Sequence, residues 1–289
     1  CPNLPFFPIV YYGILKAGAA VVPLSVLFAS REIKYHLEDS DAKAIFVFEG
    51  TDELPMGKMA KEAFDQVDSC EHLVVMCKDP TMKSPIEGHR TLTKLTFDKP
   101  DTFETVATKP DDTAAILYTS GTTGQPKGAE LTHLNILLNA MTTYNIHLPM
   151  LDFTDGEQKS CLITLPLFHV GGLCILLLPA LTHGATIHLH SRFDPGATIA
   201  ALENDMITTI ILVPAQMAAM MSHEAWDDSS FPSLTHIVVG SSLIPLAQIQ
   251  AWHERDIPVS QIYGATETGP SAIGLPIGDA MSKEGSAGK

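Results

Sequence analysis

The feature that most constrains the fold is a regular alternation of short apolar segments with longer helical ones. The short segments have strand length, and the longer ones carry apolar residues at helical spacing or a proline at their start. Strands are predicted at 44–48, 72–77, 113–117, 161–165, 184–190, 208–213, 234–239 and 258–263. Helices are predicted at 6–16, 31–38, 59–67, 133–145, 171–181, from 195 onward, at 214–221 and at 245–255. This alternation predicts an α/β fold with mainly parallel sheets and flanking helices.

Three of these helices have a residue at their start that can cap the first turn. Ser30, Thr132 and Asp194 each carry a side-chain oxygen able to accept a backbone N–H of that turn. Pro195 follows Asp194 at the first helical position, which proline favours because no N–H partner is needed there. All three are therefore predicted to be N-caps.

The most informative loop follows the strand predicted at 113–117 and reads YTSGTTGQPKG over residues 118–128. Its three glycines allow close backbone approach to a ligand, and its four hydroxyls and Lys127 supply donors and a positive charge. This inventory suits a polyphosphate. It is not the Walker P-loop, because Pro126 and Gly128 flank Lys127 where that motif needs Gly and Ser or Thr. The loop is predicted to join a strand directly to the helix that begins at His133.

A second motif, QIYGATETG over 261–269, overlaps the end of the last predicted strand. Tyr263 offers a flat face for a base, and Gly264 permits close approach. Thr266 offers a hydroxyl to a phosphate, and Glu267 is an oxygen ligand suited to Mg²⁺. A polar turn with a solvated glutamate is the alternative interpretation. The two interpretations are evenly matched for this motif alone, and the presence of the loop at 118–128 favours the functional one.

Two weaker motifs also follow predicted strands. The segment PLFHVGG at 166–172 places His169 in a loop, although a histidine among apolar residues is more often structural. Gly240, Ser241 and Ser242 form the other motif, and Gly-Ser-Ser is common in ordinary turns.

Composition excludes several classes of function. The chain has 33 acidic and 18 basic residues, a formal net charge of −15, which argues against a nucleic-acid partner. The five cysteines are scattered without metal-ligand spacing, which indicates a reduced, cytoplasmic setting. His188 and His190 share a strand face but lack a third ligand for zinc. No Gly-x-Ser-x-Gly elbow of an α/β-hydrolase is present.

The apolar run at 161–181 could suggest a membrane span. Pro166, His169, Pro179 and the pair Gly171-Gly172 interrupt it, so a strand, a loop and a core helix are predicted instead. A membrane-associated structural protein is the alternative that this run leaves open, and peripheral attachment to a membrane stays open as well.

The segments at 118–128 and 261–269 resemble two signatures of the adenylate-forming (ANL) superfamily, which includes acyl-CoA synthetases, adenylation domains and luciferases. The Pro-Leu-Phe-His sequence at 166–169 and the segment 12–24 also resemble family motifs, the latter structural. The resemblance implies the layered αβαβα large domain, with 1–289 as part of an N-terminal AMP-binding domain in two subdomains, approximately 1–160 and 161–289. It further implies that the chain is a truncated fragment without the small C-terminal domain and its lysine, and is poorly active alone.

The implied activity is that of an acyl-CoA synthetase: ATP and Mg²⁺ convert a carboxylate to an acyl-adenylate, and coenzyme A then displaces AMP. Apolar lining candidates and the absence of a charge for an amino group favour a fatty acid. The alternatives are an aryl-acid CoA ligase of the succinylbenzoate or coumarate type and a non-catalytic nucleotide-binding module. The expected partners are the acid, ATP and coenzyme A, with a homodimer left open.

The resemblance implies a role for each motif residue. Lys127, His169 and Glu267 are expected to be catalytic, and Glu267 and Thr119 are expected at the metal. The acyl pocket is expected to contain His169, Val170, Gly240, Gly264 and Gly269, with Leu173 and Ile273 as further apolar lining. The expected nucleotide-binding residues are Thr119, Ser120, Gly121, Thr122, Thr123, Gly124, Lys127, Gly240, Ser241, Ser242, Tyr263, Gly264, Ala265 and Thr266.

Overall fold

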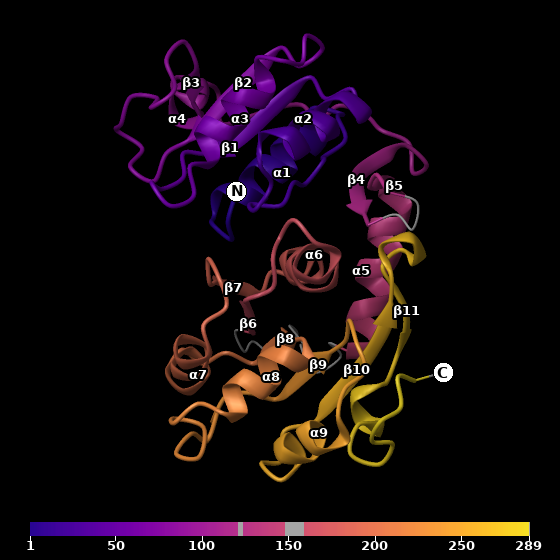
Figure 1. Cartoon of the computed structure of the whole chain (residues 1–289). Helices are drawn as coiled ribbons and strands as arrows, with labels where there is room; N and C mark the ends of the chain where they lie inside the picture. Colours follow the sequence, from indigo (N-terminus) through magenta and orange to yellow (C-terminus); the bar gives the residue numbers. More distant parts are fainter. Residues whose placement is uncertain (121–123, 148–158, 289) are drawn as a thin grey trace. The chain divides into compact units, whose positions relative to one another are not determined.

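The computed structural model describes residues 1–120, 124–147 and 159–288, with residues 144–147 described by their backbone alone. It divides into two compact units, Cys1–Glu130 and Leu131–Lys289, and each contains helices and strands (Figure 1). The predicted α/β class with mainly parallel sheets is confirmed. The subdomain boundary expected near residue 160 stays a prediction.

The first unit is built on a parallel sheet of three strands in the order β1-β2-β3. The strands are β1 (Ala44–Phe48), β2 (His72–Met76) and β3 (Arg90–Thr91). The helices of this unit are α1 (Phe6–Lys16), α2 (Ser30–Asp39), α3 (Met56–Phe64) and α4 (Leu92–Thr96). Ile33 and Leu37 of α2, Ala60 of α3 and Val75 of β2 belong to one buried apolar cluster. Burial of that cluster fixes α2 and α3 to the sheet.

The segment 118–128, called the phosphate loop from here on, connects the end of β4 (Thr113–Thr119) to the start of β5 (Lys127–Thr132). These two strands form a sheet of their own. β4 is also tied to an extended segment, since the Ile116 N–H donates to the Val21 carbonyl at 2.8 Å. The prediction that the loop joins a strand directly to a helix is therefore wrong. The sequence of β5, KGAELT, has weak strand propensity, so its pairing with β4 determines its conformation.

The second unit contains a six-stranded sheet in the order β11-β10-β9-β8-β6-β7. Its pairs are parallel apart from β11, which runs antiparallel to β10. The strands are β6 (Ser160–Ile163), β7 (Thr186–Leu189), β8 (Thr209–Leu212), β9 (His236–Val239), β10 (Val259–Gly264) and β11 (Ser271–Gly274). β6, β8 and β9 are buried at every residue, as expected for parallel strands covered on both faces.

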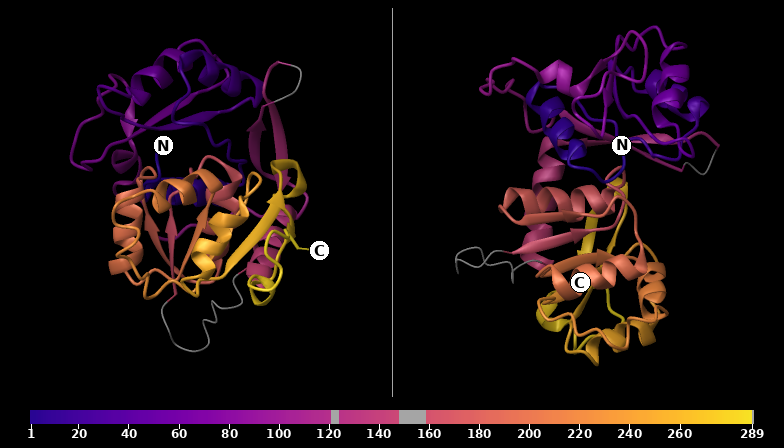
Figure 2. Two further views of the ribbon diagram at one scale, coloured as in Figure 1. Left: turned by 60° about the horizontal axis from the view of Figure 1, so that its bottom comes forward. Right: turned by 90° about the vertical axis from the view of Figure 1, so that its left-hand side faces the viewer.

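Two groups of helices cover the opposite faces of this sheet (Figure 2). One group is α7 (Pro195–Asn204), α8 (Pro214–Met221) and α9 (Leu246–His253), which pack side by side. The other is α5 (His133–His147), the π-helix η2 (Gly171–Leu177) and α6 (Leu178–Thr182). The chain thus leaves β6 toward one face and leaves β8 toward the other.

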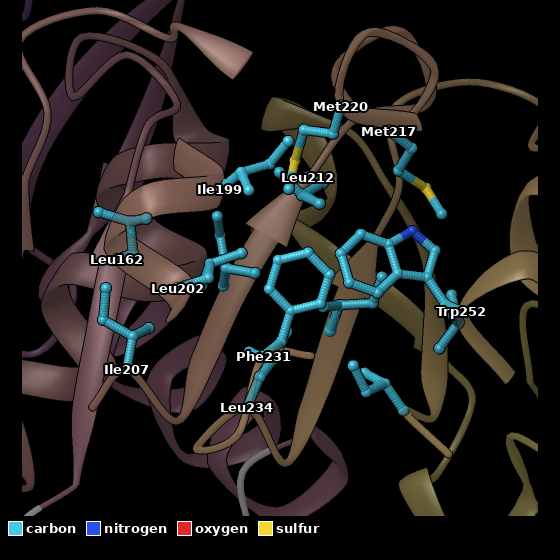
Figure 3. Close-up of a cluster of buried hydrophobic side chains, with 14 of the residues drawn as sticks. Leu162, Ile199, Leu202, Ile207, Leu212, Met217, Met220, Phe231, Leu234 and Trp252 are labelled. Atoms are coloured by element: carbon cyan, nitrogen blue, oxygen red, sulfur yellow. The ribbon is translucent and has the colours of Figure 1, made fainter. Parts of the chain in front are cut away.

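The core beneath α7, α8 and α9 is apolar and aromatic (Figure 3). The Trp252 ring lies 4.7 Å from the Trp226 ring and 5.3 Å from the Phe231 ring, measured between centroids. The Arg255 guanidinium stacks 4.3 Å over Trp226 and also donates to the Trp226 carbonyl at 2.9 Å. The Arg255 guanidinium therefore makes a cation–π contact at the edge of the core, and one of its N–H groups is hydrogen-bonded to a backbone carbonyl.

Most of the predicted elements are confirmed. α1, β1 and α8 begin and end where they are predicted, and the strands predicted in the second unit lie within two residues of their observed bounds. The Thr132 hydroxyl accepts the Asn135 N–H at 3.1 Å and the Asp194 carboxylate accepts the Ala197 N–H at 2.8 Å, so both predicted caps are confirmed.

Other predictions are corrected by the structure. Ser30 is not a cap, because Ala29 precedes the helix and the Ser30 hydroxyl donates to Glu62 of α3 at 2.6 Å. The helix predicted at 59–67 begins at Met56. The structure adds β3, α4, β5 and β11, which were not predicted, and the helix predicted at 171–181 begins as a π-helix. None of the helices in the described part of the chain is long and apolar enough to cross a membrane.

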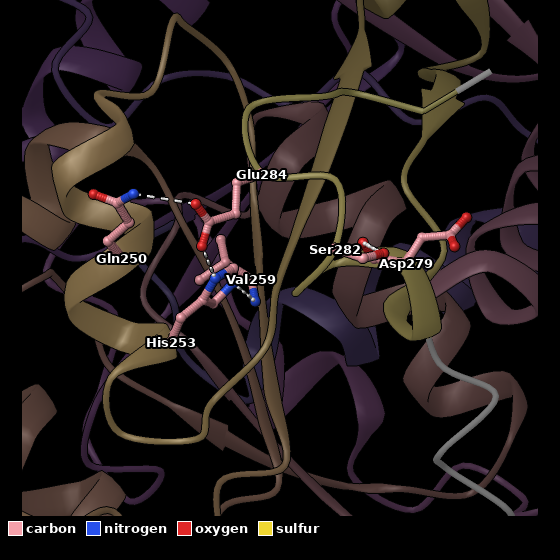
Figure 4. Close-up of polar contacts among 6 residues, drawn as sticks. All are labelled: Gln250, His253, Val259, Asp279, Ser282 and Glu284. Atoms are coloured by element: carbon pink, nitrogen blue, oxygen red, sulfur yellow. Dashed lines mark hydrogen bonds and ion pairs between the residues drawn. The ribbon is translucent and has the colours of Figure 1, made fainter.

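A hydrogen-bonded network fixes the segment near Glu284 to α9 (Figure 4). The Val259 N–H donates to His253 Nε2 at 3.2 Å, so the proton of the neutral ring lies on Nδ1. That Nδ1 donates to Glu284 at 2.8 Å, and the Gln250 amide donates to the other carboxylate oxygen at 3.2 Å. These hydrogen bonds lower the pKa of Glu284.

Replacing Glu284 with glutamine should remove one component of the acid sensitivity of folding. A carboxyl whose pKa is lowered on folding stabilises the fold above its unfolded pKa, and this contribution is lost as the pH falls through the folded value. The melting temperature of the parent should thus fall more steeply below about pH 4.3 than that of Glu284→Gln. Thermal unfolding from pH 7 to pH 3 measures this, with Glu224→Gln as the control for an exposed carboxylate. Parallel curves for parent and Glu284→Gln would contradict the prediction.

Candidate nucleotide and acyl site

The described part of the phosphate loop presents polar groups at a strand end. Thr119 is the half-buried last residue of β4, and Ser120 is exposed. Gly124 has φ +120°, a conformation that glycine adopts without strain. Lys127 is exposed as the first residue of β5. Gly121, Thr122 and Thr123 lie outside the described residues.

The second motif turns between β10 and β11 in the other unit. Tyr263 is 60% exposed and Glu267 is exposed, whereas Thr266 is 8% exposed. The Ala265 N–H donates to the Thr268 hydroxyl at 2.9 Å, which closes the short 3₁₀ turn η3 (Thr266–Thr268). The turn thus presents an aromatic face and a carboxylate to solvent and directs Thr266 inward.

Gly264 is required at this turn by close packing of the backbone. The register between β10 and β11 shifts between Tyr263 and Gly264. A Cβ atom at Gly264 would lie 1.8 Å from the Pro270 carbonyl oxygen, far inside van der Waals contact. Gly269, with φ +81°, ends the 3₁₀ turn in the left-handed region.

The Gly-Ser-Ser motif lies beside the second motif. It follows β9, the neighbour of β10, with Val239 paired to Gln261. A Cβ atom at Gly240 would lie 2.8 Å from the Ile262 carbonyl oxygen, so the two segments approach at backbone distance. Ser241 has φ +80°, which is strained for a residue with a side chain, and Ser241 and Ser242 are exposed. Strained backbone of this kind is concentrated at functional sites.

His169 occupies the loop after β6. The Gly171 N–H donates to its Nδ1 at 3.3 Å, so the proton of the neutral ring is on Nε2. Burial lowers the pKa of His169, which favours this neutral form, although part of the side chain is exposed. Of its expected neighbours, Val170 and Leu173 are buried in the core and Ile273 is half-buried.

This loop lies at the topological switch point of the sheet. β6 and β8 are neighbours, and the helices that follow them cover opposite faces. Loops that diverge in this way open a crevice at the carboxyl ends of the strands, where open α/β sheets bind ligands. Ile163 of β6, Ile211 of β8 and Gly171, Gly172 and Leu176 of η2 lie together there with Thr164 and Leu165 of the loop, and they leave no space wide enough for a water molecule.

Asn139 of α5 connects two walls of this region, and the sequence analysis did not identify it. Its amide donates to the Cys174 carbonyl of η2 at 2.7 Å, and its Oδ1 accepts the Ser271 N–H of β11 at 3.1 Å. The side chain is 3% exposed. An asparagine within an otherwise apolar helix could have drawn attention to this position. Its partners are 35 and 132 residues away in sequence, so a local pattern does not reveal them.

The donor set of the second motif fits one kind of metal. Among the described residues, no three His, Cys, Asp or Glu side chains gather as a cation site. A single exposed carboxylate such as Glu267 suits Mg²⁺, which takes one or two protein carboxylates and completes its shell with phosphate oxygens and water.

Two curated relatives show what kind of protein this chain resembles. It is 43% identical to an indoleacetate–CoA ligase of Aromatoleum aromaticum over 180 residues, which cover 62% of this chain and 34% of that protein. It is 29% identical to a feruloyl-CoA synthase of an Amycolatopsis species over 291 residues, 99% of this chain and 52% of that protein. The chain thus spans about half the length, or less, of these relatives.

Solved structures share the fold of this chain, and a family comparison identifies its family. An anthranilate CoA ligase solved with anthranoyl-AMP superposes on the whole chain and on 52% of its own, with a TM-score of 0.84 and 23% identity. An O-succinylbenzoate coenzyme A synthetase of Bacillus subtilis, solved with ATP and magnesium, superposes on the whole chain and 53% of its own, with a TM-score of 0.72 and 25% identity. The family described as AMP-binding enzyme matches residues 1–289, so the chain belongs to the AMP-binding enzyme family of the adenylate-forming superfamily.

Proposed function

We propose that this protein is an ATP-dependent coenzyme A ligase that activates an aryl carboxylic acid through an acyl-adenylate. The match to the AMP-binding enzyme family over residues 1–289 is the observation that supports this class of reaction. The phosphate loop and the motif at Tyr263–Glu267 supply the polar groups that this reaction needs.

The substrate class is revised from the fatty acid that the sequence analysis favoured. The two relatives above are named for indoleacetate and ferulate, both aryl acids. They support the aryl-acid alternative over a long alkyl chain.

The first chemical step joins the acid to AMP. A carboxylate oxygen attacks the α-phosphorus of ATP, and the bond from that phosphorus to the pyrophosphate oxygen breaks. Lys127, Thr119 and Ser120 hold the leaving pyrophosphate by charge and hydrogen bonds, and Tyr263 offers its face to the adenine. Glu267 would hold Mg²⁺, which would neutralise negative charge on the phosphates. The thiol of coenzyme A then attacks the carbonyl carbon, and AMP leaves.

His169 is assigned the role of orienting the acid. Its Nδ1 is used by the Gly171 N–H, so Nε2 is the nitrogen that donates a hydrogen bond to a carboxylate oxygen. Such a bond fixes the attacking oxygen without consuming a proton, because the lowered pKa keeps the ring neutral at pH 7.

Replacing His169 with alanine should raise the KM for the acid about tenfold, because it removes one hydrogen bond to a charged group. The KM for ATP should change little. Steady-state kinetics with each substrate varied in turn measure the two constants, and His188→Ala on β7 controls for loss of a histidine elsewhere in the same unit. Equal effects on both KM values would remove His169 from the acid subsite.

ATP–pyrophosphate exchange by the full-length protein tests the proposed function. Indoleacetate, ferulate, a fatty acid and an amino acid are offered separately. Exchange with an aryl acid is the expected result, and exchange with the fatty acid alone would restore the earlier preference. A folded protein that binds ATP but exchanges with no acid would favour a non-catalytic nucleotide-binding module.

A further inference from the structure

Both ends of the phosphate loop are hydrogen-bonded to one helix, α2. The Tyr35 hydroxyl donates to the Pro126 carbonyl at 2.8 Å, directly before β5. The Tyr118 hydroxyl, near the end of β4, donates to the Asp39 carboxylate at 2.6 Å. Tyr35 and Asp39 are four residues apart and so lie on the same face of the helix. One helix face therefore holds the two ends of the segment 118–126.

Aromatic contacts reinforce this attachment. The Tyr118 ring meets the His36 ring edge to face, with centroids 4.2 Å apart and planes at 66°. His36 is 1% exposed, donates from Nδ1 to the Glu32 carbonyl at 2.6 Å and stacks on Phe28 at 4.7 Å. Since His36 is fixed on both sides, it gives Tyr118 a rigid surface to pack against.

β5, the strand after the loop, also packs against the Tyr118 ring. A Cβ atom at Gly128 would lie 2.6 Å from Ile116 and 3.4 Å from the Tyr118 ring. Burial and the hydrogen bond to Asp39 raise the pKa of Tyr118, so its hydroxyl remains a donor at neutral pH. Tyr35 and Asp39 also need no rearrangement to hold the loop, because α2 is anchored in the core by Ile33 and Leu37.

We infer that Tyr35, Tyr118 and Asp39 are positioning residues that fix Thr119 and Lys127, at the two described ends of the phosphate loop, for binding the polyphosphate of ATP. The inference rests on the proposed function for the identity of the ligand. Because the loop ends on β4 and β5 are already fixed, less conformational freedom is lost there on binding, so the affinity for ATP depends on these hydrogen bonds between α2 and the loop ends. The sequence analysis assigned no role to Tyr35 or Asp39.

Phenylalanine substitutions test this inference, because they remove one hydroxyl and retain the ring. In the full-length protein, Tyr35→Phe and Tyr118→Phe should each weaken ATP binding about fivefold, measured by calorimetry without an acid. Thioester formation from a synthetic acyl-adenylate and coenzyme A should stay unchanged, because that half-reaction needs no pyrophosphate. Tyr12→Phe in α1 of the same unit is the matched control and should change neither value.

Substitutions at Asp39 separate positioning from a general loss of structure. Asp39→Asn retains an oxygen that accepts the Tyr118 hydroxyl, whereas Asp39→Ala does not. ATP affinity should therefore stay near the parent value in Asp39→Asn and fall about fivefold in Asp39→Ala. A fall in both half-reactions together with the melting temperature would indicate a purely structural role and overturn the inference.

The outcomes also separate this inference from the proposed function. If the parent binds ATP and the phenylalanine variants bind it equally well, the inference is wrong whatever acid is activated. If the variants bind ATP more weakly but the parent exchanges pyrophosphate with no acid, the positioning role stands and the proposed ligase activity fails. If the parent does not bind ATP at all, both fail.

Discussion

Replacing Glu267 with glutamine should slow adenylation at least about a hundredfold, the scale expected when a group that stabilises transition-state charge is lost. Glutamine keeps the shape of the side chain but removes the negative charge that suits Mg²⁺. The residue is exposed in the turn η3, so its substitution should leave the free energy of unfolding within about 0.5 kcal/mol of the parent. The change therefore isolates the chemistry from the fold.

Pyrophosphate exchange measures the Glu267→Gln effect at several magnesium concentrations. A lost metal ligand should raise the magnesium concentration needed for half-maximal rate as well as lower the rate. Glu254→Gln at the end of α9 is the matched control, because it removes one exposed carboxylate of the same unit. Unchanged exchange in Glu267→Gln would exclude this carboxylate from the reaction.

The predictions of the fold were accurate where local signals and tertiary packing agree. The all-buried strands β6, β8 and β9 read as continuous apolar runs, and the Asp194-Pro195 pair indicates the start of α7 correctly. β5 and β11 were not predicted because KGAELT and SAIG carry little strand propensity. Their conformation comes from pairing with β4 and β10, which a local pattern does not contain.

The residues of the candidate site likewise fall into those that the sequence indicates and those that only the structure reveals. Its motifs at 118–128 and 261–269 are contiguous in sequence, so residue type and position after a strand were enough to find them. The contacts of Tyr35 with Pro126 and of Asn139 with Ser271 join residues 91 and 132 positions apart. A tyrosine in an amphipathic helix and an asparagine in an apolar one have many other uses, so only the structure distinguishes these roles.

Replacing Gly264 with alanine should destabilise the second unit by about 3 kcal/mol and abolish most adenylation. The added methyl group would lie 1.8 Å from the Pro270 carbonyl oxygen. This oxygen belongs to the backbone of the turn between β10 and β11 and cannot rotate away as a side chain could. Relief therefore requires β10 and β11 to separate at their bulge, and overpacking of this kind costs about 1–3 kcal/mol or more.

A second glycine of the same unit shows whether the cost at Gly264 comes from this contact. A Cβ atom at Gly278 would meet no atom within 4 Å, and no positive φ requires glycine there. Gly278→Ala should therefore unfold within about 0.5 kcal/mol of the parent in urea, while Gly264→Ala unfolds at clearly lower urea. Separation of the strands would also move Tyr263 and Glu267, so the ATP affinity of the folded Gly264→Ala protein should fall as well. Equal stability of the two variants would mean that the turn shifts easily. The close approach at Gly264 would then not fix the positions of Tyr263 and Glu267.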